Sequence, residues 1–213
     1  MLLFGHIGIT SGVVKACDSL ISMTRLGSNY QSDSSLKFGA VIDRERLRLR
    51  YLLNGIKGRI GSIDYRIVLL GSLLPDLIDK PVWLLVSNFT SGTPFSGRNY
   101  AHTLLFNLVL FIGGSVLIRY RKPWLLILSL SSFMHLVLDQ MWNSPVALLW
   151  PLLGSLPKEE TAGWLSNMFQ ELFLYPEVYV PEIMGLVIVL LFAYRLVMRR
   201  SVISFIRSGV IGQ

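Results

Sequence analysis

The sequence predicts an all-α membrane protein, a polytopic helix bundle with about five transmembrane helices. Of its 213 residues, 52% are hydrophobic, and the mean hydropathy is +0.54. Only 15% are charged, compared with about 25% in ordinary soluble domains. The apolar residues also gather in runs that are separated by polar or basic connections. We expect the whole chain, residues 1–213, to form a single membrane-embedded domain.

The first two spans are expected on either side of a long basic connection. Residues 1–14 are apolar and carry Gly8 and a second glycine four residues later, a spacing that lets helices approach closely. This helix must continue past the apolar run to cross, since a span needs ~17–25 residues. Residues 24–65 form the connection, and the basic stretch at 43–50 is typical of an amphipathic helix on a membrane surface. The second span follows at 66–86.

Three further spans are expected in the remainder of the chain. The third covers residues 101–118 and the fourth covers 124–142, with a tight basic turn between them. Residues 143–182 form a connection outside the cytoplasm, in which 144–156 is too short and too rich in proline to cross. This piece is predicted to be interfacial or re-entrant. The last span is expected at 183–198.

The distribution of basic residues predicts the orientation of the bundle. Lysine and arginine gather in the first connection, in the turn at 119–122 and in the tail from Arg195 onwards. Between residues 143 and 182 the only one is Lys158. The positive-inside rule then places the N-terminus outside and the C-terminus in the cytoplasm. We expect the plasma (inner) membrane of a prokaryote.

The net charge of +7 bears on the partners. In a chain with this many apolar runs, the positive charge indicates contact with anionic lipid head groups at the basic segment, and membrane lipid is the expected partner. Nucleic acid is not expected. The single cysteine, Cys17, excludes an intrachain disulfide framework and a cysteine-rich zinc site.

The fourth span contains the most informative pair of residues, His135 and Asp139. They are four positions apart, so they lie on one face of a helix, where an imidazole and a carboxylate can hold a metal ion between them. A charged group at the bilayer centre costs roughly 2.5–3.5 kcal/mol on insertion scales, so such residues usually have a function. Taken alone, the pair is explained equally well by a hydrogen bond between two helices.

The orientation places further polar groups at the same depth as this pair. Asp76 and Asp79 lie in the outer half of the second span, and their like charges call for a cation between or beside them. All three histidines of the chain share this layer, with His102 at the start of the third span. The predicted metal ligands are His6, Asp76, Asp79, His102, His135 and Asp139.

The chemistry of these ligands predicts a divalent metal and hydrolysis. Mixed nitrogen and oxygen ligands suit Zn²⁺ first, with Mn²⁺ or Fe²⁺ as alternatives, and the set is large enough for one ion or two. A metal with an open position activates water for hydrolysis. Arg98, four residues before His102, can bind a phosphate or carboxylate with two parallel hydrogen bonds. An ordinary interfacial arginine explains that position equally well.

Five short motifs together resemble a known family. In chain order they are Gly5-His6, the segment 73–81 (LLPDLIDKP), the segment 98–103 (RNYAHT), the His135–Asp139 pair and the segment 149–151 (LWP). This order resembles the YdjM-like proteins, which are described as LexA-binding, inner-membrane-associated, metal-dependent hydrolases. The resemblance covers roughly residues 1–12 and 65–155.

Several positions depart from the pattern of that family. Two residues separate Asp76 from Asp79, where the family usually has one, and Lys80 stands where it has a histidine. Gly97 and Asn99 replace a further histidine and glycine. The resemblance implies a membrane-embedded hydrolase acting on phospholipid, with the six residues named above as ligands or catalytic groups.

Three functions follow as hypotheses. The first is a membrane-bound, metal-dependent hydrolase of a phospholipid or another lipid-linked (phospho)ester, with Asp76 or Asp139 as general base or metal bridge and Arg98 holding the anionic group. The second is a transporter or ion-binding protein that uses the intramembrane Asp/His cluster. The third is a non-catalytic membrane scaffold that binds a cytoplasmic partner through the basic segment at 41–59.

Overall fold

The structure is a computed structural model that describes residues 3–26, 55, 58, 61–89, 97–154 and 164–210. Every regular element within these ranges is a helix, so the predicted all-α class is confirmed for them. The basic stretch at 43–50 lies outside the described residues. The five longer helices are α1 (Leu3–Leu26), α3 (Tyr65–Phe89), α4 (Leu104–Leu117), α5 (Trp124–Leu138) and α8 (Pro176–Met198). The shorter ones are η2 (Ile118–Tyr120), η3 (Met141–Asn143), α6 (Pro145–Leu148), α7 (Trp164–Leu174) and α9 (Val202–Ser208).

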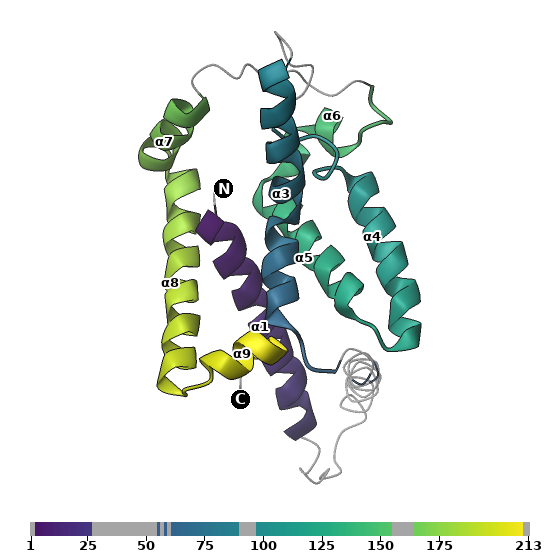
Figure 1. Cartoon of the computed structure of the whole chain (residues 1–213), viewed down its shortest axis with the longest axis vertical. Coiled ribbons are helices and arrows are strands. Elements are labelled where there is room, and N and C mark those ends of the chain that lie inside the picture. The colour runs from purple at the N-terminus through teal and green to yellow at the C-terminus, as the bar shows by residue number, and fades with distance from the viewer. Residues whose placement is uncertain are drawn as a thin grey trace, which may run out of the picture.

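The five longer helices alternate in direction through the bundle (Figure 1). In the view of the figure, α1, α4 and α8 run downwards, whereas α3 and α5 run upwards. Helix α3 packs against α1 and α5, α5 packs against α4, and α1 packs against α8. As a result, the start of α1, the middle of α3 and the end of α5 lie at one level of the bundle.

Glycines allow two of these helix pairs to approach until their backbones touch. A Cβ atom added to Gly8 of α1 would lie 2.0 Å from the carbonyl oxygen of Gly185 in α8. A Cβ atom added to Gly71 of α3 would lie 2.6 Å from the carbonyl oxygen of Leu128 in α5. Small residues at helix crossings are the usual means of close packing in membranes, where lipid supplies no hydrophobic force between helices.

The surface and the interior have the reverse of the polarity that is usual in soluble proteins. Large apolar side chains are exposed along α4 and α8, among them Leu108, Val109, Ile112, Leu190 and Leu191. Soluble proteins rarely expose contiguous apolar surface of this extent. The buried polar residues, in contrast, come from every long helix: His6, Thr10, Ser11, Ser72, Asp79, Asn107, Ser129, Ser131, Ser132, His135 and Glu182.

Length and composition identify one clear membrane span among the described helices. Helix α8 has 23 residues and is apolar enough to cross a bilayer. Residues 104–120 and α5 form apolar helices that are shorter. Helices α1 and α3 have the required length but are interrupted by the polar residues that face the bundle interior.

Three boundaries differ from those expected from the sequence. The third helix begins at Leu104 and not at residue 101, because the Thr103 hydroxyl accepts a hydrogen bond from the Phe106 amide and caps the helix there. The fourth helix ends at Leu138, and Gln140 adopts a left-handed conformation with φ 51°. Helix α8 begins at Pro176, well before residue 183, because proline is favourable in a first helical turn.

Candidate metal centre

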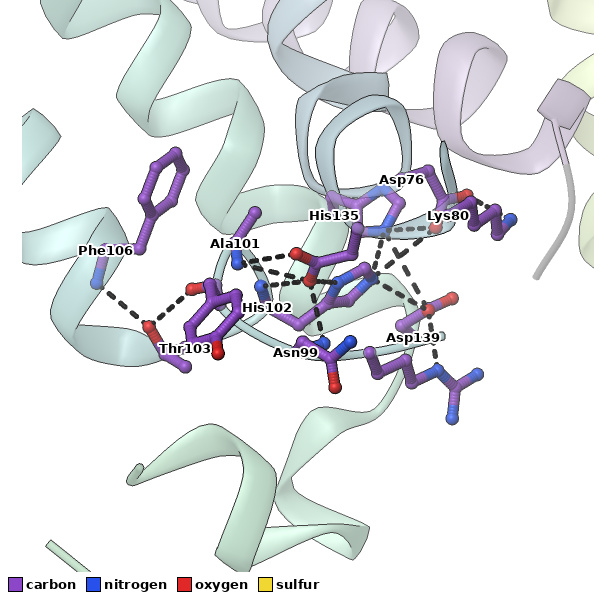
Figure 2. A network of polar contacts seen from close by, with 12 residues as sticks. Asp76, Lys80, Asn99, Ala101, His102, Thr103, Phe106, His135 and Asp139 are labelled. Atoms are coloured by element: carbon purple, nitrogen blue, oxygen red, sulfur yellow. Dashed lines mark hydrogen bonds and ion pairs between the residues drawn. The ribbon is translucent and has the colours of Figure 1, made fainter. Parts of the chain in front are cut away.

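The six predicted ligands come from four segments of the chain, and the structure brings all of them together. His6 lies near the start of α1, while Asp76 and Asp79 lie in the middle of α3. His102 lies in the loop before α4, and the fourth segment, the end of α5, supplies His135 and the residue after the helix, Asp139. Figure 2 shows the resulting network of His102, His135, Asp76 and Asp139 beside the loop that contains Asn99, Ala101 and Thr103.

Asp79 holds the loop before α4 onto α3. Its carboxylate is buried and accepts hydrogen bonds from the backbone amides of Asn99 at 2.8 Å, Ala101 at 3.1 Å and His102 at 3.2 Å. It also lies 2.8 Å from Nδ1 of the His102 ring. Since an ionised carboxylate can only accept, Nδ1 of His102 must carry the proton. In the neutral ring, Nε2 of His102 therefore presents a lone pair.

A backbone carbonyl fixes the second histidine in the same way. Nδ1 of His135 lies 2.7 Å from the carbonyl oxygen of Ser72 in α3. A carbonyl also only accepts, so Nδ1 of His135 carries the proton and Nε2 presents a lone pair. The Nε2 atoms of His102 and His135 are 3.3 Å apart. The lone pairs of the two Nε2 atoms therefore face each other in the buried interior of the bundle. A shared cation would stabilise this arrangement.

Two carboxylates complete the set of ligand atoms around these nitrogens. Oδ1 of Asp76 lies 3.5 Å from Nε2 of His102 and 3.8 Å from Nε2 of His135. Oδ2 of Asp139 lies 4.0 Å and 3.9 Å from the same two atoms. Bonds of about 2.0–2.1 Å to a tetrahedral Zn²⁺ would separate its ligand atoms by ~3.3–3.4 Å. The residues present therefore fit a divalent metal ion after small side-chain movements.

His6 adds a third imidazole to this cluster. Its ring stacks on that of His135, with centroids 3.9 Å apart and an angle of 17° between the planes. Nε2 of His6 lies 3.1 Å from Oδ1 of Asp139. The ring is fully buried, and its Nδ1 atom makes no hydrogen bond with any described residue. A buried group without a partner costs about 1–3 kcal/mol, so this ring also favours a ligand at the site.

The ligand atoms form two overlapping groups that could each hold a metal ion. One group contains His6, Asp76 and His135, and the other contains His102, His135 and Asp139. His135 belongs to both, so the groups form one continuous site. Asp79 belongs to neither group, because its oxygens are taken up by the loop amides and by Nδ1 of His102.

Two cationic side chains flank the cluster, one on each outer carboxylate. Nζ of Lys80 lies 2.6 Å from Oδ2 of Asp76, and Nε of Arg98 lies 3.4 Å from Oδ2 of Asp139. The Arg98 side chain is 44% exposed and that of Lys80 is 35% exposed, so both reach the surface of the protein. Sequence reasoning assigned no role to Lys80, although its spacing of four residues from Asp76 on one helix was a usable signal.

The segment at 149–151 contacts the loop that carries His102. The Trp150 ring packs edge-on against Tyr100, with centroids 5.2 Å apart. Trp150 follows the short helix α6 in the predicted interfacial segment, whose relation to the membrane stays a prediction. The tryptophan thereby packs against the loop that carries His102.

One comparison with known proteins gives a match. A family model described as YdjM inner membrane protein matches residues 38–202. The match reaches the last long helix and part of the basic connection, neither of which the short motifs covered. It contains five of the six clustered residues, and only His6 precedes it. No curated protein and no solved structure matches the chain.

Proposed function

The chain belongs to the YdjM inner membrane protein family, and on that premise we propose that it is a membrane-bound, metal-dependent hydrolase of a phospholipid or another lipid-linked (phospho)ester. One observation carries the proposal. The Nε2 atoms of His102 and His135 face each other at 3.3 Å, while acceptors fix both protons on the Nδ1 atoms. With carboxylates on two sides, this arrangement has the donor set of a hydrolytic metal site.

The ion would be held by His102, His135, Asp76 and Asp139, with His6 as a further ligand. Zn²⁺ is the first choice, and Mn²⁺ or Fe²⁺ are alternatives, because all three accept mixed imidazole and carboxylate ligands. When bound, such an ion polarises the ester and activates water near neutral pH.

The residues of the chain supply orientation, proton transfer and charge. Asp79 fixes the tautomer and the ring orientation of His102, and the Ser72 carbonyl does the same for His135. Asp76 or Asp139 takes the proton of the attacking water, since each has an oxygen at the centre of the cluster. Arg98, exposed beside Asp139, binds the anionic group of the substrate.

The membrane arrangement is part of the same proposal. The five longer helices cross the bilayer in alternating directions, with the N-terminus outside and the C-terminus in the cytoplasm. The alternating directions in Figure 1 support this arrangement, as does the apolar surface of α4 and α8. Arg199 and Arg200 follow the end of α8, as the positive-inside rule expects of a cytoplasmic end. The metal site then lies in the outer half of the membrane.

Metal analysis of the purified protein tests the proposal. We expect stoichiometric metal in the wild type and lipid hydrolysis that depends on it. His135→Ala and Asp76→Ala should lose both, whereas the matched control Asp64→Asn, a carboxylate outside the cluster, should keep both. The hydrolase proposal fails if the wild-type protein carries no stoichiometric metal and no added metal restores lipid hydrolysis.

A cation pathway is the second candidate, and two buried hydroxyl groups favour it. Thr10 lies one turn after His6 on α1, and Ser132 lies one turn before His135 on α5. Both are fully buried, and neither hydroxyl makes a hydrogen bond to the part of the chain that the structure describes. Such intramembrane polar groups serve proton and cation pathways. Flux of protons or divalent cations into proteoliposomes, without lipid hydrolysis, would support a transporter instead.

The scaffold hypothesis is tested by a different pair of variants. It concerns the basic segment at 41–59, which lies almost entirely outside the described residues. Replacing that segment should abolish function in a scaffold, while His135→Ala should have no effect. The hydrolase predicts the opposite result for His135→Ala.

A further inference from the structure

An apolar groove runs along the bundle beside the metal centre. It has a volume of about 650 Å³, which is within the usual range of ~300–1,000 Å³ for small-molecule sites, and it is open on one side. Its walls come from α3 and α8, and the start of α1 lies between these helices. The residues that form the walls include Phe4, Leu73, Leu77, Leu84, Ile183 and Leu186.

The groove reaches the metal centre at Asp76. This aspartate lines the groove, and its Oδ1 atom is also among the ligand atoms around Nε2 of His102 and His135. The Asp76 side chain is 16% exposed, compared with 4% for Asp139 and 0% for His135. Asp76 is therefore the most accessible of these ligands, and the groove provides a route from the apolar surface to it.

Asp76 and Lys80 lie midway along the α3 wall of the groove, with Leu73 on one side of them and Leu84 on the other. Lys80 lines the groove and pairs with Asp76 through one of its three N–H donors, so it has donors left for an anionic oxygen. Glu182, the third charged group of the lining, accepts a hydrogen bond from the Phe4 amide at 2.9 Å and so ties α1 to α8. An apolar groove with a lysine in its wall matches a hydrocarbon chain joined to an anionic head group.

We propose that the groove between α3 and α8 binds one hydrocarbon chain of an anionic membrane phospholipid, with its phosphoester beside Lys80 and Asp76. The inference rests on the proposed function, since the bound phosphoester is the substrate of the metal site. It adds a route of entry: the lipid reaches the metal sideways from the bilayer, between α3 and α8. Arg98 and Lys80 then face the head group from two sides of the cluster.

Photolabelling of the full chain in phosphatidylglycerol vesicles tests this site. A fraction of the lipid carries a photoreactive diazirine on the part of one chain nearest to the head group, which the proposal places beside Lys80. Leu186→Trp fills the groove, whereas Val187→Trp, the control, adds the same bulk at the next position, which is exposed and does not line the groove. We expect labelling at Leu77 and Leu84 to fall about tenfold in the first variant, as overpacking by ~1.4 kcal/mol would give, and to persist in the second.

A second pair of variants guards against misfolding of the first. Leu84→Trp fills the groove from α3, and Leu85→Trp is its exposed control on the same helix. Here the labelling of Ile183 on α8 is measured, with the same expected contrast. Lys80→Gln should also weaken the preference for phosphatidylglycerol over phosphatidylcholine. Equal labelling in filled and control variants overturns the proposal.

Metal content, measured on the same samples, separates this proposal from the proposed function. If the wild type binds no metal but labelling still responds to the filled groove, the hydrolase fails and the lipid site stands. If the wild-type protein binds metal and hydrolyses lipid, but the filled and control variants are labelled equally, only the groove proposal fails. If the Leu77→Cys variant forms disulfide-linked dimers and the lipid does not label the groove, a second copy of the chain covers this face. That result would also overturn the groove proposal.

Discussion

Two polar clusters in this protein differ in how their groups are paired, and the difference indicates which one binds a ligand. One is the buried metal centre around His102 and His135. The other joins the start of α3 to the end of α9, at the opposite end of the bundle (Figure 1). There the Arg66 guanidinium contacts both oxygens of Asp64, at 3.0 and 2.6 Å, and donates to the carbonyl oxygens of Ile206 and Arg207.

The junction at Arg66 is complete as it stands. Its donors meet acceptors, and the Tyr65 amide donates to the Gly209 carbonyl oxygen at 2.8 Å. In the metal centre, by contrast, acceptors face acceptors: the two Nε2 atoms and Oδ1 of Asp76. A cluster that only joins helices needs matched partners. The unmatched cluster is the one that we expect to bind a cation.

Removal of the metal should give the largest effect. A ligand present at a hundred times its Kd stabilises a protein by about 2.7 kcal/mol, so chelation should lower the melting temperature of the wild type clearly. His135→Ala should melt at the same temperature with and without chelator. Thermal unfolding in detergent, followed by tryptophan fluorescence, measures this. If chelator leaves the melting temperature of the wild-type protein unchanged, the distinction between the two clusters is wrong.

Asp79→Asn should give the next largest effect, on metal affinity, together with a loosening of the loop before α4. The amide keeps the shape of the carboxylate, but it no longer provides a charged acceptor for Nδ1 of His102 and the loop amides. Loss of such an outer partner typically costs 10–100-fold in metal affinity. Competition titration with a metal indicator dye measures the change. Asp64→Asn at the junction should leave the affinity unaltered, and an equal loss there would contradict the assignment.

Gly209→Ala should weaken the junction and leave the metal centre intact. Gly209 has φ +69°, and an added Cβ atom would collide with the Asp64 carboxylate. Strain of both kinds should destabilise the junction by about 1 kcal/mol or more. Proteolysis of the C-terminal tail should become faster, with unchanged metal content. Ser208→Ala, at the neighbouring position, is the control. Loss of metal from the Gly209→Ala variant would show that the junction and the metal centre depend on each other, which contradicts this prediction.

The junction should also respond to acid, and this is the smallest of the expected effects. The Arg66 side chain hydrogen-bonds to Asp64 and lowers the pKa of that carboxyl below its usual value. A lowered pKa in the folded state means that the contribution is present above pH ~4 and is lost as the pH falls through the folded value. Protection of the α9 amides from hydrogen exchange, relative to the intrinsic exchange rate at each pH, should fall as the pH drops below about 4. Asp64→Asn should show no such step, and high salt should reduce it in the wild type.

Sequence reasoning located the five longer helices approximately, because each leaves a local signal, but it did not predict α7 or α9. Apolar runs gave the approximate positions of α3, α5 and α8, and Gly8 marked a close contact that α1 makes with α8. The helix ends were harder to place, since they depend on caps. The Thr103 hydroxyl ends the loop and starts α4, which puts His102 outside the helix that was expected to contain it.

The roles within the cluster depend on contacts that spacing does not encode. Asp76 and Asp79 are equivalent in a one-dimensional reading, yet one faces the histidines and the other faces the loop amides. That division arises because the loop at 97–103 folds back onto α3. The carbonyl of Ser72, which fixes the His135 ring, is a backbone group. Every residue type has such a group, so the sequence could not identify this contact.

The contact between α1 and α8 has a consequence for the order in which the site is built. The Phe4 amide and Gly8, on either side of His6, are held by Glu182 and Gly185. During synthesis, residues 72–139 emerge together and can assemble five of the six clustered groups early. The contacts of α1 that flank His6 form only when α8, which is made after these residues, has inserted. We expect His6 to be the last of the three histidines to join the cluster during synthesis. A complete metal centre would then be present only in molecules in which the last long helix, α8, has already packed.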